Sequence, residues 1–164
     1  MRRTALGLLV AVVACAPAGA AGALVAGARM TPEKYQTYLD RFNQGDERYA
    51  DFYAPDVVFD HGPFYGMLRG RAAIVEFYRK ISTQMKETVT PSMVVIDNEH
   101  GLMAAEIATR LTAVADGVQL KSGPLVKGET YVSYGTVYYT FNKQGRIATI
   151  RDSAGGSERI PASK

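Results

Sequence analysis

The spacing of hydrophobic and polar positions changes near residue 88 of this 164-residue chain, from a helical period to a strand period. Over residues 31–45, large apolar side chains recur at i, i+3, i+4 and i+7, which predicts an amphipathic helix. Thr31-Pro32-Glu33 supplies an N-cap and a proline at the first helical position, and Gly45 ends the helix. A second, short helix is expected between Asp46 and Pro55, and a third after Gly70.

Strands are expected between and after these helices. Residues 57–61 alternate as a short strand, and a loop over 62–70 leads to the third helix. After residue 88, alternation of period 2 predicts further strands over 88–96, 102–114, 129–141 and 146–154, with a connecting loop over 115–128. This order indicates an α+β fold, in which three N-terminal helices pack on one face of a curved, mostly antiparallel sheet. Such a sheet forms a cone with an interior pocket.

The first 28 residues have a different character. Met1-Arg2-Arg3 is positively charged, residues 4–28 are uncharged, and residues 14–23 are a run of small residues. This layout is typical of a signal peptide, so we expect export to the periplasm or the medium, with a mature chain that begins within residues 15–30. Two alternatives stay open. Val12-Val13-Ala14-Cys15 resembles a bacterial lipobox, which would make Cys15 a lipid anchor, and residues 4–28 are long enough to remain as a membrane helix.

Charge and composition exclude several classes of function. Two of the 19 Lys and Arg residues lie in the leader, which leaves 17 basic residues against 16 acidic ones. This balance gives no argument for a nucleic-acid partner. The single Cys lies in the leader, and the two His residues are far apart in sequence, so no metal site is expected. The chain also has no Walker or dinucleotide-binding glycine motif, and we expect no cofactor.

Three segments carry a resemblance to a known superfamily. They are residues 38–46 (YLDRFNQGD), 52–59 (FYAPDVVF) and 70–78 (GRAAIVEFY). Together they resemble the nuclear transport factor 2-like superfamily, in particular its SnoaL-like and ketosteroid isomerase branch. The resemblance covers about residues 31–155 and implies a SnoaL-like domain over 29–164 with a cystatin-like α+β roll. The superfamily contains isomerases, dehydratases, cyclases, epoxide hydrolases and non-catalytic binding domains, so the resemblance does not fix the chemistry.

The resemblance also implies roles for individual residues. Tyr38 matches the first-helix tyrosine that donates to the developing oxyanion in ketosteroid isomerases. His61 stands where those enzymes have their aspartate general base, and Val137 stands where they have a second, protonated aspartate. Ile150-Arg151-Asp152 is similar to the last-strand Trp-Arg-Asp of limonene epoxide hydrolase-like members.

Alternation along the strands gives independent information on His61 and Asp152. His61 shares a face with Val57 and Phe59, which marks that face as interior. Imidazole titrates near neutrality and suits proton transfer, although a structural histidine bonded to a loop carbonyl would fit the same pattern. Asp152 shares an inward face with Ile150 and needs a partner there. It either orients His61 or forms a salt bridge with Arg151 or Arg159.

Further residues are candidates for ligand contact. Tyr131, Tyr134, Tyr138 and Tyr139 suggest an amphipathic lining, unless they reflect only the strand preference of tyrosine. Glu106 and Arg110 share a face of the strand over 102–114 with small residues, either inside the pocket or as an ion pair on the outer face. The expected ligand-binding residues are Phe59, Val137, Tyr139 and Glu106.

These observations lead to one functional hypothesis and one alternative. We expect an exported protein that binds a small apolar molecule and carries out cofactor-free isomerisation, dehydration or cyclisation. His61 is the expected base or acid, Tyr38 the hydrogen-bond donor and Asp152 the orienting group. The alternative is a non-catalytic domain for ligand binding or protein interaction. Members of the resembling family often pair through the outer face of the sheet, and strands 102–114 and 129–141 carry apolar residues on both faces, so we also expect a homodimer.

Overall fold

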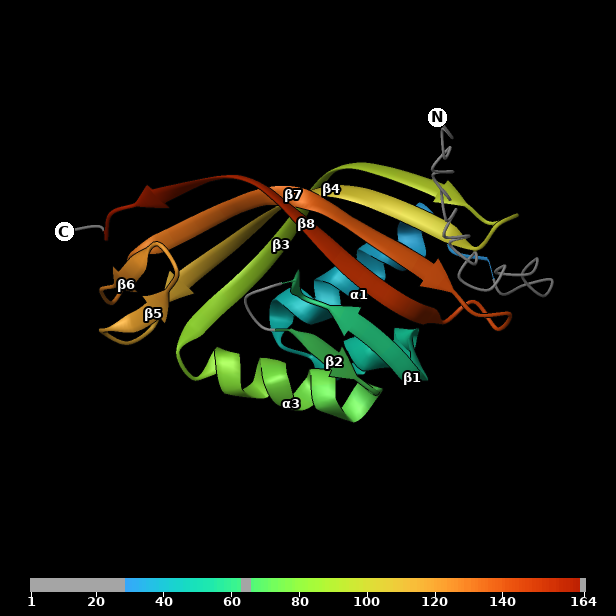
Figure 1. Ribbon diagram of the computed structural model, residues 1–164, viewed down its shortest axis with the longest axis horizontal. Coiled ribbons are helices and arrows are strands. Elements are labelled where there is room, and N and C mark those ends of the chain that lie inside the picture. The colour runs from blue at the N-terminus through green and yellow to red at the C-terminus, as the bar shows by residue number, and fades with distance from the viewer. Residues whose placement is uncertain (1–28, 63–65, 163–164) are drawn as a thin grey trace, which may run out of the picture.

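The computed structural model describes residues 29–62 and 66–162 of the chain (Figure 1). The predicted leader, including Cys15, lies outside these residues. The described helices are α1 (Pro32–Gln44), the 3-10 helix η1 (Glu47–Phe52) and α3 (Arg71–Ser82). The strands are β1 (Tyr53–Asp60), β2 (Met67–Arg69), β3 (Met85–Asp97), β4 (Leu102–Ala113), β5 (Val118–Leu120), β6 (Gly123–Leu125), β7 (Thr130–Phe141) and β8 (Ile147–Ile160).

The larger sheet has the strand order β2-β1-β8-β7-β4-β3. Every neighbouring pair is antiparallel except β1 and β8, which run parallel. The long strands β3, β4, β7 and β8 form an arch, and α1 and α3 lie on its concave side (Figure 1). The expected α+β fold, with helices on one face of a curved and mostly antiparallel sheet, is therefore confirmed. The sheet does not close into a barrel.

Helix α1 forms where the sequence pattern predicts it. The Thr31 hydroxyl accepts a hydrogen bond from the backbone N–H of Lys34, and Gly45 ends the helix in the left-handed conformation at φ 71°. Its apolar face buries Tyr35, Tyr38 and Leu39 under the sheet. The Asn43 side-chain amide then fixes the helix to β3, because it bonds both the N–H and the C=O of Val89, at 2.8 and 2.9 Å.

The sheet is curved along the paired strands β7 and β8 (Figure 1). The register between these strands shifts between Ser133 and Gly135. A Cβ atom at Gly135 would lie 2.5 Å from the backbone oxygen of Ser153, so only glycine allows this close approach. This curvature wraps the sheet around the helices and opens the space between them.

Several parts of the fold differ from the expectation. Strand β1 begins at Tyr53 rather than at residue 57, and β8 runs on to Ile160 rather than ending at residue 154. Strand β3 begins at Met85 rather than at residue 88, and Met67–Arg69 of the expected loop forms strand β2 beside β1. The predicted loop over 115–128 contains a hairpin of β5 and β6. This hairpin is stable because Val118 and Leu125 are buried against Met85 and Ala113.

Arg159 of β8 also holds the hairpin in place. Its guanidinium donates to the backbone oxygens of Ser122 and Pro124 and pairs with Glu129 at 2.7 Å.

None of the described helices is long and apolar enough to cross a membrane.

Candidate active site

A cavity of about 400 Å³ lies between the concave face of the sheet, α1 and α3. Most of its wall is apolar, and α1, α3 and six strands (β1, β3, β4, β5, β7 and β8) contribute to it. The apolar lining includes Leu39, Phe42, Phe59, Phe77, Ile81, Val89, Ile107, Leu111, Val137 and Ile150. Size and lining together fit a small, largely apolar organic molecule.

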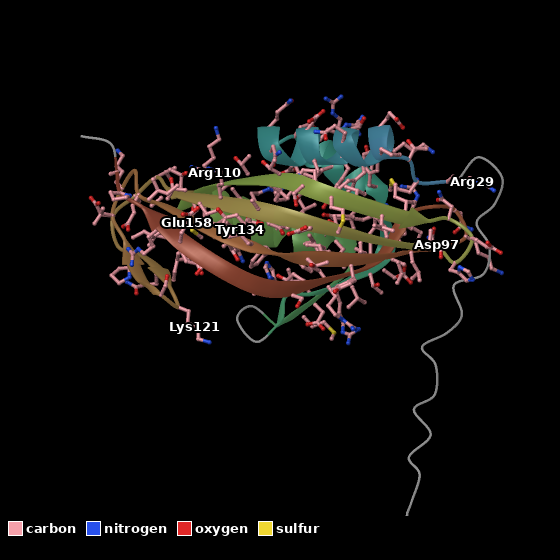
Figure 2. All side chains as sticks on the ribbon, turned by 90° about the horizontal axis from the view of Figure 1, so that it is seen from above. Arg29, Asp97, Arg110, Lys121, Tyr134 and Glu158 are labelled. Atoms are coloured by element: carbon pink, nitrogen blue, oxygen red, sulfur yellow. The ribbon has the colours of Figure 1, made fainter. Side chains whose placement is uncertain are left out.

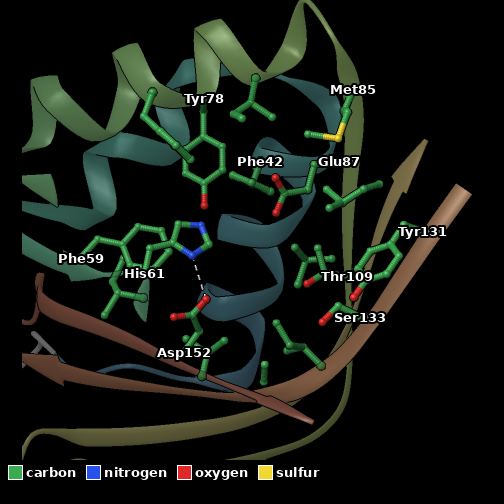
Figure 3. Close-up of a pocket in the computed structure, with 18 of the residues that line it drawn as sticks. Phe42, Phe59, His61, Tyr78, Met85, Glu87, Thr109, Tyr131, Ser133 and Asp152 are labelled. Carbon is green, nitrogen blue, oxygen red and sulfur yellow. Dashed lines mark ion pairs between the residues drawn. The ribbon is translucent and has the colours of Figure 1, made fainter. Parts of the chain in front are cut away.

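His61 and Asp152 form an ion pair inside this cavity (Figure 3). The Nδ1 atom of His61 lies 2.9 Å from Oδ2 of Asp152. His61 directly follows β1, and Asp152 lies on β8, so the parallel pairing of these strands brings the two side chains together. Of the two partners expected for Asp152, the structure therefore has the imidazole. Arg151 faces Asp60 at 3.8 Å instead, and Arg159 pairs with Glu129.

Two aromatic rings fix the orientation of the imidazole. The Phe59 ring stacks on His61 with centroids 4.4 Å apart, and the Phe77 ring meets it edge-on at 5.6 Å. Only 20% of the His61 side chain is exposed. With Nδ1 donating to the Asp152 carboxylate, Nε2 becomes the basic nitrogen of the ring. Figure 3 shows that this second nitrogen lies on the side facing Tyr78 and Glu87.

Tyr38 lines the same cavity but is part of a buried network of tyrosines. Its hydroxyl lies 2.9 Å from that of Tyr53, and the Tyr35 hydroxyl lies 3.2 Å from that of Tyr139. Burial raises the pKa of Tyr38 and of Tyr53 well above the usual value, so both stay neutral and keep their protons. When Tyr53 donates to Tyr38, the Tyr38 hydroxyl can donate a hydrogen bond to a ligand.

Glu87 is a polar residue of the cavity that the sequence analysis missed. It lies on β3, and its carboxyl group lies to the right of Tyr78 of α3 and of His61 in Figure 3. Burial raises the pKa of Glu87, the positive charge of His61 lowers it, and the nearby Asp152 carboxylate raises it, and the net pKa is about 7. A carboxyl group with this pKa is partly protonated at neutral pH.

The expected ligand-binding residues are divided between the two faces of the sheet. Phe59, Val137 and Tyr139 line the cavity, as expected. Glu106 is exposed on the outer face of β4, because the inward positions of that strand are Met103, Ala105 and Ile107.

The four strand tyrosines divide in the same way. Tyr131 and Tyr139 line the cavity, whereas Tyr134 and Tyr138 are 44% and 49% exposed. Neither of these two exposed side chains lines the cavity, so the expected lining by Tyr134 and Tyr138 is wrong. Figure 2, seen from above the arch, labels Tyr134 and Glu158, whose side chains are hydrogen-bonded at 2.6 Å.

A second group of polar side chains lies farther along the cavity. Thr109 of β4 and Ser133 of β7 place hydroxyl groups there, beside Tyr131 (Figure 3). The cavity thus presents an acid–base group at one end, hydroxyl groups toward the other, and apolar walls between them. Among the described residues, no cluster of His, Cys, Asp and Glu could hold a metal ion.

Comparison with known proteins agrees with the fold. The SnoaL-like domain profile matches residues 35–150. A candidate polyketide cyclase from Xanthomonas campestris pv. campestris is 26% identical, with a TM-score of 0.60, over 72% of this chain and 84% of that one. No curated protein gives a match to the chain.

Two further solved structures share the fold at lower identity. The epoxide hydrolase/cyclase-like enzyme SalBIII, of pyran ring formation in salinomycin, is 17% identical, with a TM-score of 0.59, over 75% of this chain and 88% of that one. A computationally designed 17-OHP binder is also 17% identical, with a TM-score of 0.59, over 77% of this chain and 92% of that one.

Proposed function

Because the chain belongs to the SnoaL-like domain family, we propose that it is a cofactor-independent enzyme that moves a proton on a small apolar carbonyl compound. The reaction class is isomerisation, dehydration or cyclisation. The names of two proteins of similar structure, a candidate polyketide cyclase and an epoxide hydrolase/cyclase-like enzyme, support this class.

The observation that carries the proposal is the ion pair of His61 and Asp152 inside an apolar cavity. Asp152 accepts the Nδ1 proton and stabilises the imidazolium that forms when Nε2 takes a proton from the substrate. The apolar walls lower the local polarity, which strengthens these interactions. Tyr38 donates a hydrogen bond to the oxygen on which negative charge develops.

A ketone with exchangeable α-hydrogens tests this proposal without knowledge of the natural substrate. The probe is α-tetralone, a bicyclic ketone, and its parent hydrocarbon tetralin is the control for binding. In D₂O, the wild-type protein is expected to bind both molecules and to accelerate deuterium uptake at the α-carbon of α-tetralone, followed by NMR. His61→Ala should lower this rate about 10²- to 10⁴-fold.

His100→Ala is the matched control, because His100 lies in an exposed turn beside Asp97 and is not among the residues that line the cavity. It should exchange like the wild type. Asp152→Asn should lose part of the rate, since the imidazole loses its orienting charge. Binding of α-tetralone without faster exchange would contradict catalysis and favour the non-catalytic binding domain. Failure to bind either molecule would contradict the whole proposal.

We place this activity outside the cytoplasm, on the strength of residues 1–28. Their charged start, apolar middle and small-residue end support removal of the segment on export. Intact-mass analysis of the native protein should find a chain that begins within residues 15–30. A mass that retains residues 1–14 would contradict cleavage, and an added lipid mass on Cys15 would identify a lipoprotein.

A further inference from the structure

Glu87 places a carboxyl group without a partner in the cavity. It stands on β3 opposite Leu111 of β4, and Met85 and Val89 on either side of it also line the cavity. Within residues 29–62 and 66–162, its carboxyl oxygens form neither a hydrogen bond nor an ion pair. A polar group in such surroundings is costly unless something satisfies it. A ligand in the cavity is in the right place to do so.

The position of Glu87 relative to His61 suggests which part of a ligand it meets. Nδ1 of His61 faces Asp152, and the other ring nitrogen faces the side of the cavity where Tyr78 and Glu87 lie (Figure 3). A base and a carboxyl group therefore border the same space from different strands. A ligand there would present a carbon to one group and an oxygen to the other.

We propose that Glu87 is a second catalytic residue, the acid that protonates the carbonyl oxygen of the substrate while His61 removes a proton from the α-carbon. This inference rests on the proposed function and narrows its substrate class to apolar ketones and enones with an α-hydrogen. Val137 stands where the resembling ketosteroid isomerases have a second, protonated aspartate. In this chain Glu87 of β3 supplies a carboxylic acid in the cavity instead.

The step balances in atoms and charge. The α-carbon–hydrogen bond breaks, its proton goes to Nε2 of His61, and its electron pair forms the carbon–carbon double bond of the enol. The carbonyl oxygen takes the proton of Glu87, which becomes a carboxylate. Return of the His61 proton to a conjugated carbon, and of the enol proton to Glu87, completes isomerisation. When the proton on His61 first exchanges with solvent, return of the solvent-derived proton to the same carbon completes exchange.

Glu87 suits this role better than the neighbouring tyrosines. Burial holds the pKa of Tyr38 and of Tyr78 well above 10, so these hydroxyls donate hydrogen bonds but transfer protons poorly. Burial raises the pKa of Glu87 to about 7, which lies near the operating pH and favours proton transfer in both directions. Below about pH 7, Glu87 is mainly neutral and can donate a hydrogen bond or a proton. Above that pH it is mainly a carboxylate and can donate neither.

Other titratable groups surround Glu87 and enter the design of the test. Four elements packed around it contribute His61, Asp152 of β8, Tyr78 of α3 and Tyr49 of η1. Glu87 also borders a second pocket of about 240 Å³, where Glu47, Arg79 and Lys86 lie. A pH effect caused by any of these groups would persist when Glu87 alone is replaced.

The test compares the binding of α-tetralone and tetralin by calorimetry between pH 5.5 and 8.5. The ketone oxygen only accepts hydrogen bonds, and tetralin makes none. For the wild type, α-tetralone should bind about 3- to 10-fold more weakly at pH 8.5 than at pH 5.5, the effect of one hydrogen bond, while tetralin binding stays constant.

Two variants at position 87 separate the explanations. Glu87→Gln keeps a donor at every pH, so it should bind α-tetralone without the pH dependence. Glu87→Leu should bind the ketone at pH 5.5 as weakly as the wild type does at pH 8.5, and should lose exchange activity while it still binds tetralin. Unchanged far-ultraviolet circular dichroism shows that each variant is folded.

The outcomes also separate this inference from the proposed function. Ketone binding that keeps its pH dependence in Glu87→Gln, or a wild-type exchange rate in Glu87→Leu, would overturn the role of Glu87 and leave that of His61 intact. Wild-type protein that binds neither probe would instead overturn the proposed function itself.

Discussion

The hydroxyl groups of Tyr38 on α1 and Tyr53 on β1 lie 2.9 Å apart in the buried wall of the cavity. Their rings are also in contact, with centroids 5.9 Å apart. This pairing ties the first helix to the first strand and points the Tyr38 hydroxyl along a fixed direction. When Tyr53 is the donor of this pair, Tyr38 is also the stronger donor to a ligand, because a hydroxyl that accepts one hydrogen bond is polarised toward giving another.

Tyr38→Phe tests whether that donor serves the reaction. The variant should lower the rate of α-tetralone exchange about fivefold, since one hydrogen bond is worth about 1 kcal/mol, and so should lose less than His61→Ala. Tyr35→Phe is a suitable control because Tyr35 is buried beside Tyr38 and its hydroxyl bonds Tyr139 instead. Equal losses in both variants would show that the effect comes from packing.

The raised pKa of Glu87 predicts how stability depends on pH. Its pKa is about 7 in the folded protein and near 4.5 when unfolded, so the folded state holds a proton that the unfolded chain releases. The contribution of Glu87 to stability is therefore complete below about pH 4.5 and falls as the pH rises to about 7. In urea denaturation, the free energy of unfolding of Glu87→Gln should rise relative to that of the wild type by roughly 2–3 kcal/mol between pH 4.5 and 8. A difference in unfolding free energy that stays constant with pH would contradict the raised pKa of Glu87.

Gly135 should be the glycine least tolerant of substitution on β7 and β8. Gly135→Ala would press a methyl group against the backbone oxygen of Ser153 at the point where the register between β7 and β8 shifts. We expect a loss of about 1–3 kcal/mol in the free energy of unfolding. Gly156→Ala is the matched control, because its Cβ meets nothing within 4 Å, and it should unfold like the wild type. Equal stability of the two variants would contradict the packing argument.

The outer face of the sheet is where we place a homodimer contact. Val95, Ala104 and Tyr138 form one row across β3, β4 and β7, and the exposed Met93 and Leu102 flank that row. Sedimentation at micromolar concentration should give a dimer for the wild type and a monomer for Val95→Asp. Val126→Asp is the control, since Val126 is as exposed as Val95 but lies beyond the β5–β6 hairpin. A monomeric wild type would contradict this interface.

Strand alternation was enough to predict much of the site. The period of 2 fixes which side chains of a strand share a face, so Phe59, His61 and Asp152 could be placed inward from sequence alone. The contact between His61 and Asp152 follows from the parallel neighbourhood of β1 and β8, which the sequence only suggests. The mutual pairing of Tyr38 and Tyr53 depends on tertiary packing and has no sequence signal.

Glu87 was missed because the start of β3 is ambiguous in sequence. Met85 fits the apolar stripe of the third helix and also the inward face of β3. Once β3 begins at Met85, the alternation Met85, Glu87, Val89 puts the carboxyl group in the cavity. The β5–β6 hairpin was missed for a different reason. Its two strands have three residues each, and contacts with Met85, Ala113 and Arg159 stabilise them.

A crystal structure with α-tetralone bound at pH 6 tests most directly whether this cavity is an acid–base site. The expected complex has the α-carbon about 3–3.5 Å from Nε2 of His61 and the ketone oxygen about 2.6–3.2 Å from the Glu87 carboxyl group. The His61–Asp152 contact should be retained at 2.9 Å. A ketone bound outside the cavity, or bound inside it with its α-carbon turned away from His61, would contradict the claim that His61 is the base.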